Sequence, residues 1–426
     1  MNTLLIQRVR LDGAETDILI EGNRIARIAP EIAPGTARVI DGSGKAAIPP
    51  FYNTHTHAAM TLLRGYADDM ELFTWLNDYI WPAEGRLAGE DIYAGTRLAL
   101  LEMIRSGTVF FNDMYWYQPD AIRAVEEMGM RAAIGLLYIS GSDGAVLERN
   151  RKCNEELLAW NGGGSGRIQV AHAPHAVYTV SEEVLRRVAE DAKADGHVIH
   201  IHASETAREV EECVAAHGMT PIAYLDSLGI LGPRTVLAHA VHLSDGDIEI
   251  IRERGAYISL CPCSNFKLAS GQFRYRRAVE MGCCRFTIGT DGCASNNNLS
   301  MLEEMKFAAL SAKNESGSPT AGRDGDIFRA ATRTGAEAFE IDAGVIAAGK
   351  LADIVLVDLD NPLLVPDFNL TANLVYSADS SCIDTVICDG RILMENREIP
   401  GEAEILAEAR RVCAKIRALR TGGAGA

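Results

Sequence analysis

The chain has 426 residues, of which 47% are hydrophobic and 23% charged. This composition is typical of a globular protein and excludes disordered and fibrous classes. The formal net charge of −17 would repel a nucleic-acid backbone, so we expect no nucleic acid among the partners. No apolar run approaches the roughly 20 residues of a membrane helix. The N-terminus also lacks a signal core, and we expect a cytoplasmic protein without a membrane partner.

The ten cysteines are scattered along the chain and do not predict a disulfide framework. Cys283 and Cys284 are adjacent, which is poor disulfide geometry. Cys261 and Cys263 have no second pair at zinc-finger spacing. Since a chain of this length does not need cross-links, we expect reduced and mostly buried thiols.

Both ends of the chain have the pattern of short strands separated by turns. Near the N-terminus, residues 16–20 and 24–28 alternate around the turn 21–23, which predicts a hairpin. Late in the chain, residues 352–358 and 385–393 combine apolar runs with Asp and Gly turns in the same way. We therefore expect the two chain ends to meet in one small β-domain.

The middle of the chain repeats an apolar strand, a loop and an amphipathic helix. Most of these strands are continuous apolar runs, which is typical of strands buried on both faces of a parallel sheet. Eight such units predict an α/β fold, namely a (β/α)8 TIM barrel with its catalytic groups at the C-terminal ends of the strands. The expected strands are residues 47–57, 108–113, 131–138, 168–173, 197–203, 235–240, 256–261 and 285–291.

These patterns predict how the chain is divided. Residues 1–50 and 345–400 would form the small, β-sandwich-like domain. Residues 51–344 would form the barrel, and residues 401–426 a C-terminal helix and tail.

Residues that can bind a metal ion lie at the C-terminal ends of the expected barrel strands. His55 and His57 are two apart on the first strand, so both imidazoles project to the same side. The fifth strand ends at His202, the sixth at His239 and the eighth at Asp291. Because the C-terminal ends of barrel strands meet at one rim, these five residues predict a metal site.

The same residues and their flanking segments resemble the amidohydrolase superfamily. Residues 53–57, 295–298 and 349–355 agree with its pattern, and the resemblance covers about residues 3–400. One departure is the sequence Pro-Pro-Phe at residues 49–51, where the family usually has Pro-Gly. It should affect only the approach of the chain to the barrel.

The resemblance implies one metal ion in each subunit. Relatives with two metals usually carry a bridging lysine on the fourth strand, and residues 169–175 contain no lysine. The ligands would be His55, His57, His202 and Asp291, with one position left for water. Zn²⁺ fits three imidazoles and a carboxylate, and Fe²⁺ or Mn²⁺ could occupy the same ligands.

Further segments are similar to deaminases of adenosine derivatives with altered 5′ groups. In that branch the residue matching Glu205 moves a proton to the ring nitrogen, although a glutamate there could simply favour a helix N-terminus. The residue matching Glu84 would accept charge-assisted hydrogen bonds from the ribose hydroxyls, and His175 would contact the nucleoside. Glu84 could instead be a solvated lid residue and His175 a loop-capping residue. The segments are residues 60–65, 75–84, 174–175, 264–268 and 289–297.

The resemblance implies hydrolytic deamination at C6, which gives the inosine analogue and ammonia. The metal would lower the pKa of a water molecule to about 7. Asp291 would take its proton, His239 would stabilise the hydroxide, and Glu205 would protonate N1. The expected substrates are 5′-deoxyadenosine, 5′-methylthioadenosine and S-adenosylhomocysteine, with adenosine as a further candidate.

Several alternatives stay open. The same barrel could deaminate a free base (guanine or cytosine), hydrolyse a triazine, or be a non-catalytic binding protein. S-adenosylhomocysteine would need an arginine for its amino-acid tail, and Arg149 and Arg151 are available without an obvious register. The aromatic stretch at residues 114–117 could line the pocket or lie at a subunit interface, since we expect a homo-oligomer.

Overall fold

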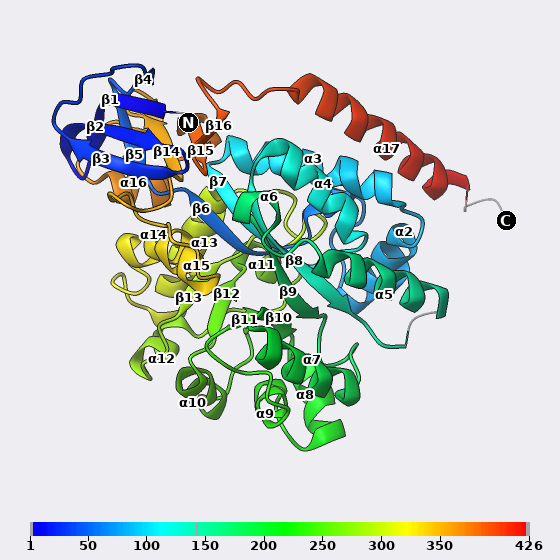
Figure 1. Ribbon diagram of the computed structural model, residues 1–426. Helices are drawn as coiled ribbons and strands as arrows, with labels where there is room; N and C mark the ends of the chain where they lie inside the picture. Colours follow the sequence, from blue (N-terminus) through cyan, green and yellow to red (C-terminus); the bar gives the residue numbers. More distant parts are fainter. Residues whose placement is uncertain (1–2, 142–143, 423–426) are drawn as a thin grey trace.

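The computed structural model describes residues 3–141 and 144–422, which form two eight-stranded sheets (Figure 1). One sheet is a nearly closed barrel of parallel strands in the order β13-β12-β11-β10-β9-β8-β7-β6. This arrangement confirms the predicted TIM-like barrel. Its strands are β6 (Phe51–Thr56), β7 (Thr108–Asp113), β8 (Arg131–Tyr138), β9 (Ile168–Pro174), β10 (Val198–Ala203), β11 (Thr235–His239), β12 (Tyr257–Leu260) and β13 (Phe286–Ile288).

Helices follow the barrel strands and surround the barrel (Figure 1). The larger ones are α3 (Gly89–Arg105), α4 (Gln118–Met128), α5 (Gly144–Leu158), α7 (Glu182–Asp195), α8 (Ala207–His217), α10 (Asp245–Arg254), α13 (Met301–Ser316) and α14 (Asp324–Ala331). Shorter ones are α6 (Gly163–Gly166), α9 (Pro221–Ser227), α11 (Pro262–Lys267), α12 (Tyr275–Glu280) and α15 (Arg333–Ala338). Three further short helices lie later in the chain, between two strands of the second sheet: η3 (Pro362–Leu364), α16 (Leu370–Tyr376) and η4 (Ser380–Cys382).

After β6 the chain forms a run of short helices before α3. This run is η1 (Ala58–Leu63), α1 (Leu72–Thr74), the π-helix η2 (Trp75–Ile80) and α2 (Trp81–Glu84). We call residues 58–84 the lid segment, because several of its side chains line the cavity described below.

The second sheet is built from both ends of the chain, as expected, and its blue and orange strands lie together in Figure 1. Its order is β16-β15-β14-β5-β1-β2-β3, with β4 beside β1. The predicted hairpin is the antiparallel pair β2 and β3. The strands are β1 (Thr3–Leu11), β2 (Ala14–Glu21), β3 (Arg24–Ala29), β4 (Arg38–Asp41), β5 (Lys45–Ile48), β14 (Ile354–Asp358), β15 (Ile383–Cys388) and β16 (Arg391–Met394).

The expectation of a single first barrel strand over residues 47–57 is wrong. β5 ends at Ile48 and pairs with β14 in the terminal sheet, whereas β6 begins at Phe51 and belongs to the barrel. Pro49 and Pro50 lie between the two strands. Proline has no backbone N–H to donate, so it interrupts a ladder and lets the chain pass from one sheet to the other.

A buried ion network joins the barrel to the terminal sheet. The Arg131 Nε of β8 lies 2.9 Å from Asp353 Oδ2, and Arg131 Nη2 lies 2.6 Å from Asp389 Oδ1. The Tyr52 hydroxyl of β6 donates to Asp353 Oδ2 at 3.2 Å. All three charged side chains are at most 5% exposed, so each charge depends on its partners rather than on water.

The long helix α17 (Glu402–Gly422) packs along α3, where Arg97 and Arg105 pair with Glu408 and Glu402. Residues 423–426 of the expected tail lie outside the described part of the chain. The domain boundaries near residues 50, 344 and 400 stay a prediction that limited proteolysis can check.

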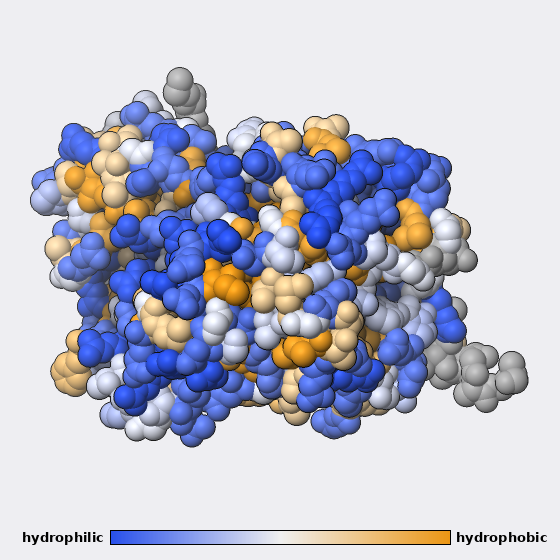
Figure 2. Space-filling view, turned by 90° about the horizontal axis from the view of Figure 1, so that it is seen from below, coloured by the Kyte–Doolittle hydropathy of each residue, from blue (hydrophilic) through white to orange (hydrophobic). Residues whose placement is uncertain are grey.

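No helix within residues 3–141 and 144–422 is both long and apolar enough to cross a membrane. On the face seen in Figure 2, hydrophobic residues form small patches between hydrophilic ones. All ten cysteines are free, in agreement with the predicted absence of disulfides. The predicted homo-oligomer remains to be tested by light scattering of the purified protein.

We predict that Arg131→Met destabilises the protein by about 3–5 kcal/mol, because it leaves two buried carboxylates without their cation. Urea unfolding followed by circular dichroism would measure the loss. Arg187→Met is the matched control, since this side chain is 80% exposed and its removal should change stability by less than about 0.5 kcal/mol. Equal stability of the two variants would contradict the proposed dependence on the network.

Candidate metal centre and substrate cavity

The five predicted rim residues come together where β6 and β13 close the barrel. The Asp291 amide, which follows β13, donates to the His55 carbonyl of β6 at 3.0 Å. The Thr56 hydroxyl donates to the Asp291 carbonyl at 2.9 Å. These bonds hold Asp291 in a left-handed conformation with φ of 58° and direct its buried carboxylate toward His57.

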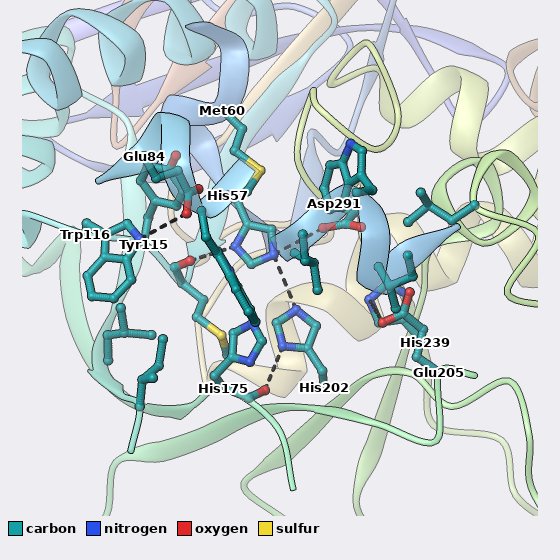
Figure 3. Close-up of a pocket in the computed structure, with 18 of the residues that line it drawn as sticks. His57, Met60, Glu84, Tyr115, Trp116, His175, His202, Glu205, His239 and Asp291 are labelled. Carbon is teal, nitrogen blue, oxygen red and sulfur yellow. Dashed lines mark hydrogen bonds and ion pairs between the residues drawn. The ribbon is translucent and has the colours of Figure 1, made fainter. Parts of the chain in front are cut away.

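Two of the histidines have one ring nitrogen held by a backbone carbonyl. His57 Nδ1 lies 2.6 Å from the Met114 oxygen, and His202 Nδ1 lies 2.7 Å from the His175 oxygen. A carbonyl can only accept, so each Nδ1 carries the hydrogen and each neutral ring has its lone pair on Nε2. The two Nε2 atoms face each other at 3.3 Å (Figure 3). Two lone pairs at this distance repel unless a proton or a cation lies between them.

The electrostatics at this point favour positive charge. Burial lowers the pKa of His57, but the hydrogen bond and the charge of Asp291 outweigh it and raise the pKa to about 9. Asp291 Oδ1 lies 3.3 Å from His55 Nε2 and 3.2 Å from His57 Nε2. Its other oxygen accepts from Ser264 Oγ at 2.6 Å and from Ser295 Oγ at 2.8 Å.

The donor set therefore fits a metal ion. His55 Nε2 is fully buried and makes no hydrogen bond within the described part of the chain. The three Nε2 atoms of His55, His57 and His202, together with Asp291 Oδ1, are donors of the kind that zinc prefers. His55 Nδ1 lies 2.8 Å from His200 Nε2, so His200 orients the ring of His55. The sequence shows that His200 and His202 are two residues apart on β10, but it does not show that His200 contacts His55.

His239 belongs to the same cluster. A ligand nitrogen of its ring lies within 4.8 Å of those of His55 and His202. His239 Nδ1 lies 2.8 Å from Asn265 Oδ1, which leaves Nε2 toward the cavity. The backbone of His239 is left-handed, with φ of 69° at the end of β11.

Glu205 lies next to His239 and outside the following helix. Its Oε2 is 3.9 Å from His239 Nε2, and its Oε1 accepts from Ser270 Oγ at 3.2 Å. Helix α8 begins at Ala207 with Thr206 as its N-cap, so the alternative of a helix N-terminal glutamate is wrong. Burial raises the pKa of Glu205 above its ordinary value, although His239 opposes the shift. This shift favours the protonated form of the carboxyl group over that of an exposed glutamate.

Glu84 lies in α2 on the other side of His57 and His202 from Glu205 (Figure 3). Its side chain is buried, so it is not a solvated lid residue. Glu84 Oε2 accepts from Trp116 Nε1 at 3.3 Å, and Oε1 has no partner among the described residues. Burial raises the pKa of Glu84.

His175 has both a structural contact and a face toward the cavity. Its Nδ1 lies 2.9 Å from Thr179 Oγ1, which supports the loop-capping alternative. Its ring nevertheless lines the cavity, with its centroid 4.8 Å from that of His202. Burial and the nearby His57 lower the pKa of His175 to about 3, so this imidazole is neutral.

The remaining cavity wall is apolar and aromatic. Met114, Tyr115 and Trp116 line it, which supports the pocket alternative for these three residues of the stretch 114–117. Tyr117 instead donates its hydroxyl to the Leu87 carbonyl. Sequence reasoning did not assign the other apolar lining residues, which are Met60, Leu72, Trp75, Leu76, Trp81, Leu137, Ile139, Tyr178 and Leu268.

Neither candidate arginine lines this cavity. The guanidinium of Arg149 stacks on Tyr117, 4.8 Å from the ring centroid. Arg151 pairs with Glu148 and Glu155 on the exposed face of α5. Residues 142–143 of the same loop lie outside the described part of the chain.

A second histidine and aspartate cluster provides a useful contrast. His172 Nε2 lies 2.9 Å from Asp195 Oδ2, and His172 Nδ1 lies 2.9 Å from the Tyr138 hydroxyl. His197 Nε2 lies 3.0 Å from Asn161 Nδ2. Both nitrogens of His172 thus have hydrogen-bond partners without a cation.

We predict that His202→Ala sharply lowers the divalent metal content of the purified protein, measured by elemental analysis. The substitution removes one of four converging donors. His197→Ala is the control and should keep the metal content of the unsubstituted protein. Full metal content in His202→Ala would show that these donors do not hold the ion.

Comparison with known proteins shows to which family this chain is similar. The model of the amidohydrolase family matches residues 46–393. The chain is 50% identical over 394 residues to 5′-deoxyadenosine deaminase of Methanothermobacter thermautotrophicus, covering 92% of this chain and 91% of the relative. It is 44% identical over 407 residues to 5-methylthioadenosine/S-adenosylhomocysteine deaminase 1 of Archaeoglobus fulgidus, covering 94% and 95%.

Among solved structures, an adenosine deaminase from Xanthomonas campestris with bound zinc matches with a TM-score of 0.92 and 33% identity. The match covers 97% of this chain and 98% of that one. The family match over most of the chain and the identities above lead to one conclusion: the chain belongs to the amidohydrolase family.

Proposed function

We propose that this protein is a hydrolase that removes the C6 amino group of adenosine derivatives with modified 5′ groups, giving the inosine analogue and ammonia. One observation carries the proposal: Glu205 and His239 face a cation-binding cluster from one side of the cavity, and Glu84 faces it from the other (Figure 3). The two relatives named for 5′-modified adenosines support this substrate class.

His55, His57, His202 and Asp291 would hold one Zn²⁺ in each subunit, and Fe²⁺ or Mn²⁺ would fit the same donors. When bound, the cation supplies the Lewis acidity that makes a water molecule acidic near neutral pH. The zinc-containing relative supports zinc as the first choice.

In this proposal Asp291 and His239 control the attacking water. The Asp291 carboxylate accepts its proton, and the two serine hydroxyls on Oδ2 keep this carboxylate oriented. His239 has its Nδ1 toward Asn265, so its Nε2 can hydrogen-bond the water. The oxygen then forms a bond to C6.

Glu205 acts on the ring. Its buried carboxyl group gives a proton to N1 as the oxygen adds to C6. Asp291 next gives its proton to the amine, the bond from C6 to nitrogen breaks, and ammonia leaves. The proton of the C6 hydroxyl returns to Glu205. Both carboxyl groups thus regain their starting states, and one water is consumed for each ammonia released.

Glu84 and His175 would bind the nucleoside. Glu84 Oε1 is buried without a partner among the described residues, so it can accept a hydrogen bond from a ribose hydroxyl. A second vicinal hydroxyl would reach Oε2. The neutral His175 ring adds a further contact beside them.

The cavity favours uncharged 5′ groups. None of its lining residues within the described ranges is a lysine or an arginine, and Arg149 and Arg151 have other partners. A substrate carboxylate would find no cation among these lining residues. We therefore propose 5′-deoxyadenosine and 5′-methylthioadenosine as better substrates than S-adenosylhomocysteine.

We predict this order in a deaminase assay on metal-analysed protein, measured by the release of ammonia. The assay would compare adenosine, the three 5′-modified nucleosides, guanine and cytosine. The value of kcat/KM for 5′-deoxyadenosine should exceed that for S-adenosylhomocysteine by about 10-fold or more, because an unpaired charge is costly to desolvate. Turnover of a free base alone would instead support the guanine or cytosine alternative and contradict the roles of Glu84 and His175.

We predict that Glu205→Gln keeps the metal content and loses about 10²–10⁴-fold in kcat, because an amide cannot move a proton to N1. Elemental analysis and steady-state kinetics on 5′-deoxyadenosine would test both statements. A variant with a near wild-type kcat would rule out Glu205 as the proton donor.

A further inference from the structure

We propose that Glu209 is a positioning residue that holds Glu205 in place for proton transfer. This inference rests on the proposed function, because it concerns the residue that we assign as the proton donor. Glu209 lies in the first turn of α8 and does not line the cavity. It therefore acts through Glu205 rather than on the substrate.

Both carboxylate oxygens of Glu209 accept hydrogen bonds from the turn that contains Glu205. Glu209 Oε1 accepts from the Ser204 amide at 2.9 Å, and Oε2 accepts from the Glu205 amide at 2.8 Å. The Glu209 side chain is buried, so no water competes strongly for these bonds. One carboxylate thus fixes two successive backbone amides immediately before the helix.

The turn needs such an anchor because its backbone is unfavourable. Ser204 has a φ of 52°, in the left-handed region that residues other than glycine rarely adopt. The Ser204 carbonyl also accepts from the His242 amide at 2.9 Å, which ties the turn to the segment after β11. The carboxylate of Glu209 holds the amide side of the same turn.

The helix does not require Glu209 as a cap. Thr206 already caps α8, since its Oγ1 accepts from the Glu209 amide at 3.1 Å. A glutamate at this position of a helix commonly reaches back to the amide of the N-cap residue itself. Here the carboxylate passes Thr206 and reaches the two residues before it. Its bonds therefore stabilise the turn at residues 204–205, and the turn sets the direction of the Glu205 side chain.

Glu209→Gln in the metal-loaded enzyme tests the proposal. The variant keeps the shape of the side chain, but its amide has one accepting oxygen, so one backbone N–H loses its partner. We expect kcat to fall by about 10–100-fold, since small displacements of a catalytic group are costly. KM for 5′-deoxyadenosine and the metal content should stay near wild-type values. Glu209→Asp keeps the charge, but its shorter side chain cannot reach both backbone amides, so its kcat should fall in the same way.

Glu211→Gln is the matched control, because Glu211 is exposed on the same helix. It should leave kcat unchanged. The double variant Glu205→Gln/Glu209→Gln should be no slower than Glu205→Gln alone, because Glu209 is proposed to act only through Glu205. Losses that multiply in the double variant would overturn the proposal and indicate a general structural role.

Hydrogen exchange of the amides at residues 204–205 provides a readout that does not depend on activity. Exchange should be faster in Glu209→Gln than in the unsubstituted protein and in Glu211→Gln. An unsubstituted enzyme that is inactive on every nucleoside overturns the proposed function. An active enzyme whose Glu209→Gln variant keeps full kcat, or shows unchanged exchange, overturns this inference alone.

Discussion

The closure of the barrel between β6 and β13 is the interaction on which the site depends. The bond from the Asp291 amide to the His55 carbonyl links β6 to the segment that follows β13, and these two strands are the ends of the strand order. It brings the two histidines of β6 next to the carboxylate after β13. The same bond places Asp291 within 3.3 Å of the imidazole nitrogens of His55 and His57. This backbone contact thus brings the candidate metal-binding groups together.

Burial then gives these groups their reactivity. Three carboxyl groups, Glu84, Glu205 and Asp291, lie around one cavity with four histidines. Burial raises the pKa of Glu84 and Glu205, and the nearby charge of Asp291 adds to the shift of Glu205, whereas His55 and His57 keep the pKa of Asp291 well below its ordinary value. Burial thus favours the protonated form of Glu84 and Glu205, while Asp291 keeps its negative charge, which is the division of roles that acid–base catalysis needs.

The barrel and its rim residues were predictable from the sequence. Buried strands are continuous apolar runs, and the rim residues are the polar residues at the C-terminal ends of these runs. Seven of the eight strands lie close to the expected ranges. The first did not, because Pro49 and Pro50 divide one apolar run between two sheets. His200 and Glu209 were not assigned, since their roles follow from contacts with His55 and with the turn before α8. The sequence of the lid segment has only weak hydrophobic periodicity, and a π-helix such as η2 has no simple sequence pattern.

The split of the terminal sheet has a consequence for how the chain folds as it is made. β5 lies between β1 and β14, so one edge of the N-terminal strands stays unpaired until β14 has been synthesised. An exposed strand edge of this kind favours pairing with other chains. The newly made N-terminal strands would therefore need protection during almost the whole of translation, and slower elongation through the barrel would lengthen that exposure.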